Sequence, residues 1–316
     1  MKHPAYHLRV NKTVDRLTFI DAVKRIARLN DLAEYTYYGF GGPYLEDFRL
    51  LYEFYPEIKM VSIESNDETF KRQRFHAPCN ESQLTLRKLN FKSFLARYDP
   101  RDEKSIFWLD YTGLEFGNFE DFMLLLGNVS ANSIIKITLR CESSDYIGKD
   151  AKQEEFRQKF EEVLPYSHAT PPIDLVDFAA LLQEMVQIAA QKSLSSGMPM
   201  MFQPVSSFCY KDGVGMFTLT GVVCQRTETA RINAAFKGWR FANLVWKKPM
   251  LIDLPTLSTK ERLHLQRRLP CAKGSGKTLR LALGYLIEDD KRSTEKKLKQ
   301  YADFHRYSPY FMKALP

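Results

Sequence analysis

The chain has 316 residues, of which 44% are hydrophobic, 27% charged and 13% aromatic. This composition is typical of one large or two modest globular domains, and it excludes a wholly disordered, collagen-like or disulfide-dense protein. Five widely spaced cysteines without a CxxC pair favour a reducing, cytoplasmic compartment, and no stretch is apolar enough to predict a transmembrane span or a membrane partner.

The net charge of +8 is unevenly distributed along the chain. Residues 225–316 contain 20 of the 46 Lys and Arg but only 8 of the 38 Asp and Glu, a balance of +12, which leaves −4 for residues 1–224. A basic C-terminal third attracts polyanions such as nucleic acid, although a Lys/Arg-rich surface also serves solubility alone. We therefore predict two domains, 1–224 and a basic, mainly helical appendage at 225–316.

The first 224 residues alternate between helical and strand-like patterns. Alternation of this kind predicts an α/β fold whose mostly parallel sheet is covered by helices on both faces. Lys211-Asp212-Gly213 separates two β-rich runs and predicts a hairpin with an antiparallel last strand. The expected helices are 14–29, 43–55, 66–75, 119–128, 151–164 and 173–194, and the expected strands are 34–40, 58–63, 84–89, 105–109, 133–139, 202–210 and 216–224.

A glycine turn and an acidic residue stand out in this pattern. Gly39, Gly41 and Gly42 follow the first strand, and glycines let a backbone approach a ligand closely while the next helix points its positive end at the same place. Glu64 ends the second strand, where a carboxylate can accept hydrogen bonds from both hydroxyls of a ribose. Because ligands of parallel sheets bind beyond the carboxyl ends of the strands, these residues predict a nucleotide-type cofactor site.

The dinucleotides NAD and FAD fit this turn poorly. Their fingerprint, GxGxxG, requires a glycine at position 44, which is Tyr44. A pyrophosphate also needs free backbone amides near position 43, and Pro43 has none. A different nucleotide cofactor is therefore expected.

Three motifs resemble those of the class I S-adenosylmethionine-dependent methyltransferases, and this resemblance covers roughly residues 30–224. The motifs are YYGFGG (37–42), VSIES (61–65) and FWLDYTG (107–113). The resemblance implies a Rossmann-like methyltransferase sheet and S-adenosylmethionine as cofactor. It also implies that Gly39, Phe40, Gly41 and Gly42 bind the cofactor and that Glu64 holds its ribose.

The same resemblance places Asp110 and Tyr111 at the catalytic edge of the sheet. Asp110 would act as a general base for a hydroxyl nucleophile or as the acceptor that positions it, and otherwise caps a loop. Tyr111 would stack on a planar substrate or belong to the core. The motif departs from the D-P-P-Y of amino-methyltransferases that act on bases, and Tyr37-Tyr38 stands where the family usually has an acid before its glycines.

Three functions are consistent with these observations. The first is a methyltransferase of unknown acceptor, with a C-terminal region that binds nucleic acid or a protein partner. The alternative is a catalytically reduced methyltransferase-like binding protein, such as a sensor, a scaffold or an antitoxin-like subunit, and the departure at Asp110-Tyr111-Thr112 favours it over a base methylase. The third is a nucleic-acid-binding module whose Rossmann-like part only provides structure, and the balance of +12 in the C-terminal region favours this function or a nucleic-acid substrate.

Other motifs do not predict a site. The six histidines form no HExxH motif or acidic cluster, so no metal site is predicted. Gly274-Ser-Gly-Lys-Thr278 resembles the end of a P-loop, but Cys271 replaces its first glycine, so a basic loop is expected. The run Lys71–His76 predicts a solvated basic helix face.

The basic C-terminal region combines predicted helices with aromatic residues. Ser258 and Glu261 form a capping box that should begin a helix through Arg268, Leu279–Ile287 could be a strand or a short helix, and Ser293–Tyr307 predicts a Lys-rich helix. The aromatic residues would form a nucleic-acid surface or pack the region against the sheet domain. They are Trp239, Phe241, Trp246, Tyr285, Tyr301, Tyr307 and Tyr310.

Overall fold

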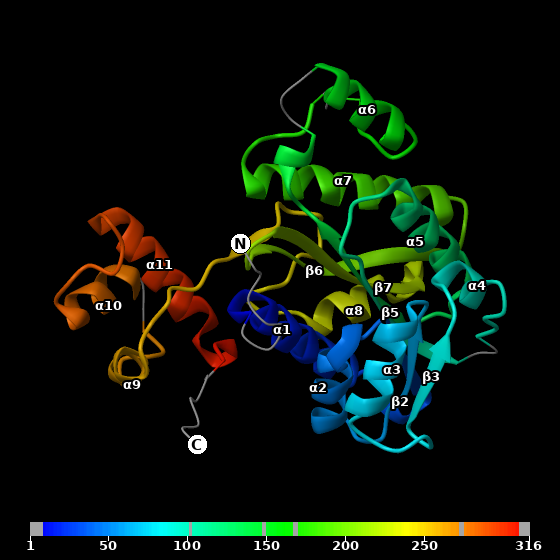
Figure 1. Ribbon diagram of the computed structural model, residues 1–316, viewed down its shortest axis with the longest axis horizontal. Helices are drawn as coiled ribbons and strands as arrows, with labels where there is room; N and C mark the ends of the chain where they lie inside the picture. The colour runs from blue at the N-terminus through cyan, green and yellow to red at the C-terminus, as the bar shows by residue number, and fades with distance from the viewer. Residues whose placement is uncertain (1–8, 101–102, 147–149, 167–169, 272–274, 310–316) are drawn as a thin grey trace. The chain divides into compact units, whose positions relative to one another are not determined.

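The computed structural model describes residues 9–100, 103–146, 150–166, 170–271 and 275–309. It divides into two compact units (Figure 1). The larger comprises residues 19–209 and 214–250, and the smaller comprises the described residues within 1–18, 210–213 and 251–316. Residues 225–250 thus belong to the larger unit, and the domain boundary at 224/225 stays a prediction.

One mixed sheet runs through the described part of the chain, with the strand order β3-β2-β1-β4-β5-β7-β6-β8. β1 pairs in parallel with β2 and β4, while β5 pairs antiparallel with β7. The predicted fold class, a mostly parallel Rossmann-like sheet with an antiparallel last strand, is confirmed. The strands are β1 (Tyr35–Gly39), β2 (Lys59–Glu64), β3 (Leu84–Lys88), β4 (Lys104–Asp110), β5 (Ser133–Arg140), β6 (Met200–Lys211), β7 (Gly215–Gln225) and β8 (Met250–Ile252).

Helices lie on both faces of this sheet (Figure 1). The α-helices are α1 (Val10–Ile26), α2 (Glu46–Phe54), α3 (Asp67–His76), α4 (Phe91–Leu95), α5 (Phe116–Asn128), α6 (Asp150–Phe160), α7 (Leu175–Ser193), α8 (Thr229–Ala235), α9 (Thr259–Gln266), α10 (Ser275–Leu283) and α11 (Lys291–Phe304). The short 3-10 helices are η2 (Leu32–Glu34), η3 (Gly42–Tyr44), η4 (Ser143–Asp145), η5 (Arg226–Glu228) and η6 (His305–Tyr307). Among the described residues, no helix combines the length and apolarity needed to cross a membrane.

Strand β4 shows how the sheet separates the two helical layers. Phe107 and Trp108 are consecutive residues of β4 and point to opposite faces of the sheet, as successive residues of a strand must. The Phe107 ring lies 6.3 Å from Phe94 of α4, and the Trp108 ring lies 5.1 Å from Phe19 of α1. Trp108 also lies beneath the buried ammonium of Lys136, 4.2 Å from its ring centre. Both faces of β4 are therefore buried, as its apolar sequence predicts.

The predicted hairpin forms, and its turn has a second role within the smaller unit. Asp212 accepts hydrogen bonds from the backbone N–H groups of Asn11, at 3.3 Å, and Lys12, at 2.8 Å. These are amides of the first turn of α1, which have no partner inside the helix and favour a carboxylate. Burial nevertheless raises the pKa of Asp212. This distant cap explains why α1 begins at Val10 rather than at the predicted residue 14.

The C-terminal part of the smaller unit is helical. The capping box of Ser258 and Glu261 begins α9 as predicted. The buried apolar cluster of the smaller unit consists of Leu257, Leu265, Leu279, Leu298, Tyr301 and Ala302. α10 ends at Leu283, which decides the open alternative at Leu279–Ile287 in favour of a helix.

The structure contradicts the expected basic loop at 274–278 from Ser275 onward. Gly274 lies outside the described residues. Ser275 to Thr278 form the first turn of α10. A Cβ on Gly276 would lie 2.0 Å from the backbone oxygen of Glu295 on α11. This glycine therefore allows two helices to pack closely, and it does not form a phosphate-binding loop.

Candidate functional site

The predicted glycine turn has a left-handed backbone directly after β1. Gly41 and Gly42 have φ angles of 69° and 54°. A Cβ on Gly41 would lie 2.4 Å from Leu45 Cδ2, whereas a Cβ on Gly42 would meet no atom within 4 Å. Gly41 is thus required by the fold, and Gly42 borders open space. Pro43 does not open the α-helix directly, because η3 intervenes and α2 begins at Glu46.

A carboxylate lies beside this turn although the sequence has no acid before its glycines. Asp47, in the first turn of α2, accepts a hydrogen bond from the Tyr37 hydroxyl. Its Oδ2 would lie 3.3 Å from a Cβ on Gly39. The acid is therefore supplied from the helix that follows the turn. The sequence analysis missed it because the contact joins residues ten positions apart across a non-repetitive segment.

Glu64 is the last residue of β2, and it lies at the same edge of the sheet as the turn. In the parallel pairing of β1 with β2, Gly39 is opposite Ser62, so Glu64 stands two residues further toward the carboxyl edge. Glu64 is half-buried, and its Oε1 accepts a hydrogen bond from the Asn66 N–H at 2.7 Å. Asn66 in turn caps α3. The carboxylate is thus held at the edge by the start of the next helix.

Asp110 is the last residue of β4, which pairs with β1 on the side opposite β2, and Tyr111 follows it. Gly39 is opposite Trp108 in that pairing, which brings Asp110 to the same edge as Glu64. The Tyr111 hydroxyl donates to Asp121 of α5 at 2.9 Å. Burial raises the pKa of both Tyr111 and Asp121. The Tyr111 hydroxyl is thus engaged within the protein, and its ring faces the turn.

One aromatic contact joins the predicted cofactor residues to the predicted catalytic residues. The Phe40 ring packs edge-to-face on Tyr111, with centroids 5.3 Å apart, and Phe91 approaches Phe40 from α4 at 5.5 Å. The structure therefore brings the turn, Glu64, Asp110 and Tyr111 to one edge of the sheet. Their individual roles stay predictions.

The run Lys71–His76 forms the second half of α3 and differs from the expectation at one position. Lys71, Arg72 and Arg74 are exposed, as a solvated basic face requires, but Gln73 is completely buried. Its amide donates to the backbone oxygens of Phe40, at 2.7 Å, and Gly42, at 2.9 Å. The burial of Gln73 is indicated in the sequence only by the presence of an uncharged residue within a charged run.

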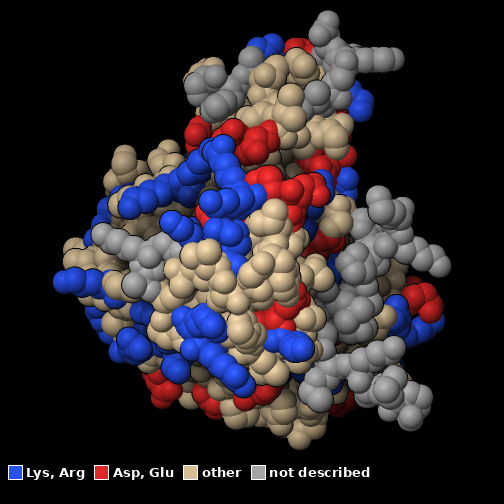
Figure 2. Space-filling view, turned by 90° about the vertical axis from the view of Figure 1, so that its left-hand side faces the viewer, with Lys and Arg blue, Asp and Glu red and all other residues tan. Residues whose placement is uncertain are grey.

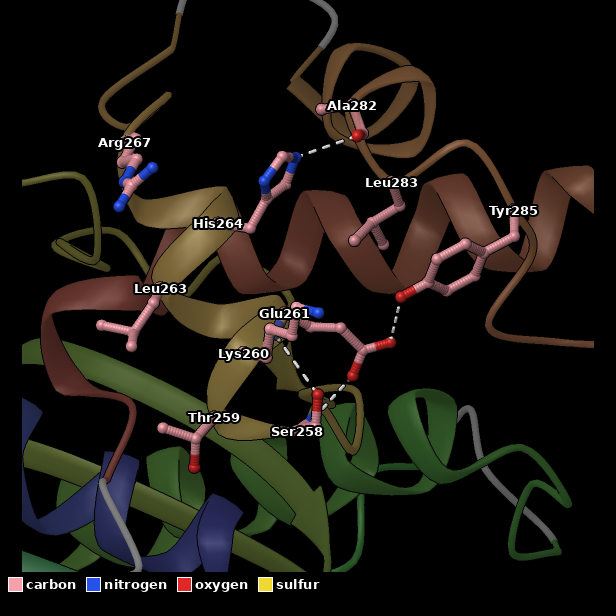
Figure 3. Close-up of a pocket in the computed structure, with 10 residues that line it drawn as sticks. All are labelled: Ser258, Thr259, Lys260, Glu261, Leu263, His264, Arg267, Ala282, Leu283 and Tyr285. Atoms are coloured by element: carbon pink, nitrogen blue, oxygen red, sulfur yellow. Dashed lines mark hydrogen bonds between the residues drawn. The ribbon is translucent and has the colours of Figure 1, made fainter.

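A cavity lies in the smaller unit, between α9 and the end of α10 (Figure 3). Its volume is about 840 Å³. The Tyr285 hydroxyl points at Glu261 and donates to it at 2.6 Å, and Ser258 contacts the same carboxylate (Figure 3). Its lining residues are Ser258, Thr259, Lys260, Glu261, Leu263, His264, Arg267, Ala282, Leu283 and Tyr285. We call this cavity the C-terminal groove.

Three of the six described aromatic residues of the predicted surface are buried, and Trp246 and Tyr307 are half-buried. Trp239, Phe241 and Tyr301 are buried, and the Trp239 indole donates to Asp21 at 2.7 Å, whereas Tyr285 is 50% exposed. Tyr310 lies outside the described residues.

In the view of Figure 2, Lys and Arg side chains lie above and below an area that is largely uncharged. Across the described ranges, no three His, Cys, Asp or Glu side chains form a cluster that could hold a metal ion.

Comparison with known proteins gives the family. The model of the family described as "Putative O-methyltransferase" matches residues 4–316, while no curated protein matches the chain.

Two solved structures illustrate more distant likenesses. A probable spermidine synthase from Corynebacterium glutamicum is 11% identical, with a TM-score of 0.42, and the match covers 78% of this chain and 82% of that one. Trm1 from Pyrococcus horikoshii, in complex with S-adenosyl-L-methionine, is 10% identical, with a TM-score of 0.48, and the match covers 74% of this chain and 61% of that one. Both TM-scores are too low to support an argument, so the assignment rests on the family model. Since that model matches nearly the whole length, the chain belongs to this O-methyltransferase family, whose methyl donor is the predicted cofactor, S-adenosylmethionine.

Proposed function

We propose that this protein transfers a methyl group from S-adenosylmethionine to a hydroxyl oxygen at the carboxyl edge of β1, β2 and β4. The observation that supports this most directly is the placement of the glycine turn, Glu64 and Asp110 at that one edge, joined by the contact between Phe40 and Tyr111. The family description names oxygen as the methyl acceptor.

The residues at this edge fit the cofactor. Gly42 borders open space on which an amino-acid moiety can lie against the backbone. Glu64 supplies the carboxylate that two ribose hydroxyls require, and its hydrogen bond from Asn66 fixes its orientation. Gly39, Phe40, Gly41 and Gly42 would therefore bind the amino-acid part, and Glu64 the ribose.

Catalysis needs positioning more than covalent chemistry. When bound, S-adenosylmethionine supplies an electrophilic methyl group. Asp110 would accept the proton that the acceptor hydroxyl loses as its oxygen forms the new bond to carbon. Tyr111 would hold the turn against β4, because its hydroxyl is already bonded to Asp121. Holding the reacting atoms in line can account for a large part of the rate.

The alternative is a methyltransferase-like protein that binds the cofactor and catalyses no transfer, as a sensor, scaffold or antitoxin-like subunit. The sequence Asp110-Tyr111-Thr112-Gly113 favours this alternative over a base methylase, because it lacks the prolines of base-methylating motifs. In either case all five cysteines are free, which supports the proposed cytoplasmic location.

Association with nucleic acid is the second part of the proposal. The C-terminal groove combines Lys260 and Arg267, both exposed, with the half-exposed ring of Tyr285. Exposed cations and an accessible aromatic ring on one surface are typical of sites that bind single-stranded nucleic acid. A protein partner with an acidic segment is the competing occupant.

Two measurements on the full-length protein test this function. Calorimetry should detect binding of S-adenosylmethionine and S-adenosylhomocysteine, but not of NAD. Transfer of tritiated methyl groups should then be measured on hydroxyl-bearing acceptors, including RNA, with wild type and Asp110→Asn. Transfer that Asp110→Asn abolishes supports the enzyme; binding without transfer to any acceptor supports the non-catalytic alternative; absence of binding contradicts both.

A further inference from the structure

Gln73 reverses the usual pattern of a surface helix. It is the buried residue of α3, with 0% exposure, while the neighbouring Phe75 is 85% exposed. Burying an amide costs free energy unless its hydrogen bonds are satisfied. An arrangement with the polar side chain inside and the aromatic one outside therefore indicates that the amide has a specific task.

Every kind of hydrogen-bonding group on the Gln73 amide is used. Nε2 donates to the backbone oxygens of Phe40 and Gly42, and Oε1 accepts from the Ser62 hydroxyl at 2.9 Å. Two carbonyl oxygens can be satisfied only by the NH₂ group, so their positions fix the orientation of the amide. Ser62 is itself completely buried.

These bonds fix the backbone of the glycine turn. The turn contains two consecutive residues with positive φ, a conformation that glycine leaves easily because it is sterically so free. With the Phe40 oxygen held toward α3, the planar trans peptide directs the Gly41 N–H to the opposite side. Gln73 thus determines which side of the turn presents a backbone donor.

The same amide connects the turn to β2. Ser62 lies two residues before Glu64 on that strand, so both side chains belong to the same face of β2. The Phe40 oxygen, the Gln73 amide and the Ser62 hydroxyl form a continuous chain of hydrogen bonds. This chain sets the spacing between the turn and the strand that ends in Glu64.

We propose that Gln73 is a positioning residue of the cofactor site. From the side of the turn that faces α3, it fixes the glycine turn relative to Glu64. This inference rests on the proposed function, because it assumes that the cofactor binds at this edge. Gln73 itself need not touch the cofactor.

The larger unit contains a matched control for the experiment. Gln183 of α7 is 3% exposed, and its Nε2 also donates to two backbone oxygens, those of Trp246 and Lys247, both at 3.0 Å. Its Oε1 accepts from Asn243 at 3.3 Å. Gln183→Met and Gln73→Met therefore each remove two bonds donated by Nε2 and one accepted by Oε1, but only Gln73 belongs to the proposed cofactor site.

The test compares both variants of the full-length protein by calorimetry with S-adenosylhomocysteine and by thermal denaturation. We expect similar decreases in Tm, but a dissociation constant raised about tenfold only in Gln73→Met. Should Gln73→Met fail to fold, Ser62→Ala takes its place, with an expected increase of about threefold. It removes the hydrogen bond to Gln73 Oε1 and a longer one, of 3.5 Å, to the Phe40 oxygen, but it leaves both donors of Gln73 Nε2.

The possible failures are distinguishable. Binding by Gln73→Met or Ser62→Ala that equals wild type overturns this inference and leaves the proposed function intact. Equal weakening in Gln183→Met also overturns it, because the effect is then one of general stability. If wild type does not bind, the proposed function fails, and this inference fails with it.

Discussion

The ring of Phe40, in the glycine turn, packs edge-to-face on the ring of Tyr111 at the end of β4, with centroids 5.3 Å apart. Edge-to-face pairs of this kind contribute about 0.5–1.5 kcal/mol beyond the area that they bury. The contact couples the segment proposed to bind the cofactor to the segment proposed to orient the acceptor. A displacement of either segment therefore disturbs the other.

The hydroxyl of Tyr111 is expected to be structural. Tyr111→Phe keeps the ring contact with Phe40 but removes the donor to the half-buried Asp121, and loss of a hydrogen bond to a carboxylate costs about 1–3 kcal/mol. Urea denaturation should show that loss, while the affinity for S-adenosylhomocysteine stays within about twofold of wild type. A variant of unchanged stability that no longer transfers methyl groups would instead place the hydroxyl in the chemistry.

Glu64 is expected to be the main determinant of cofactor affinity. Glu64→Ala removes two charge-assisted hydrogen bonds to the ribose, partly compensated by water, so the dissociation constant should rise about 10- to 100-fold. Glu68→Ala is the control, because Glu68 is exposed on α3, pairs with Lys71 and involves the same change of charge. Calorimetry measures the dissociation constant of the cofactor for both variants. A comparable increase in Glu68→Ala would contradict the role of Glu64.

Gly41 should tolerate no side chain. Gly41→Ala places a Cβ 2.4 Å from Leu45 Cδ2 on a backbone with φ of 69°, which we expect to destabilise the protein by about 1–3 kcal/mol. Gly113→Ala, just after β4, meets nothing within 4 Å and should be nearly neutral. Denaturant unfolding compares the two, and a stable Gly41→Ala variant would show that the turn can adopt another conformation.

The C-terminal groove should give nucleic-acid binding a steep salt dependence. Lys297 and Lys299 of the Lys-rich helix α11 are already engaged, because Lys297 pairs with Asp253 and Lys299 with Asp303. We therefore expect Lys260→Gln with Arg267→Gln to reduce the log–log slope for single-stranded RNA by about 1–2, since each phosphate contact contributes about 0.7.

The double variant Lys297→Gln with Lys299→Gln makes the same change of net charge and should leave this slope unchanged. Fluorescence anisotropy at several salt concentrations measures both. Equal slopes for the two double variants would contradict a localised site, and absence of RNA binding at low salt would favour the acidic protein partner.

The pairing of Tyr285 with Glu261 should appear in the acid stability of the protein. The hydrogen bond from Tyr285 is the main reason that the pKa of Glu261 is lowered from its ordinary value of 4.5. A carboxyl with a lowered folded-state pKa adds stability above its unfolded pKa, and this stability is lost as the pH falls through the folded pKa. Tyr285→Phe should therefore lower Tm at pH 6, with a difference from wild type that shrinks below pH 4.5. A difference that is constant with pH would contradict this linkage.

Much of the fold could be predicted because it follows local patterns. The apolar runs ending in Glu64 and Asp110 are short and bounded by turns, and their parallel pairing brings both acids to one edge. The hairpin around Asp212 has an equally local signal. These features depend on residues close together in the sequence.

The contacts that complete the site could not be predicted in this way. Gln73 lies in a run of charged residues, where periodicity indicates a solvated face, and its burial depends on carbonyl oxygens more than 30 positions away. Asp47, in the first turn of α2, lies beside the glycine turn because its carboxylate accepts the hydrogen bond of the Tyr37 hydroxyl from β1. Both are consequences of tertiary packing, which overrides the local pattern.

The smaller unit also constrains the order in which the chain can fold as it is synthesised. Asn11 bonds to Asp212, and its side chain accepts from the Leu254 N–H, 243 positions later. A chain emerging from the ribosome must therefore extend beyond Leu254 before the start of α1 finds both partners. A chain shortened before Leu254 would keep the cap from Asp212 and lose the donor to the Asn11 side chain, whereas one shortened before Asp212 would lose both.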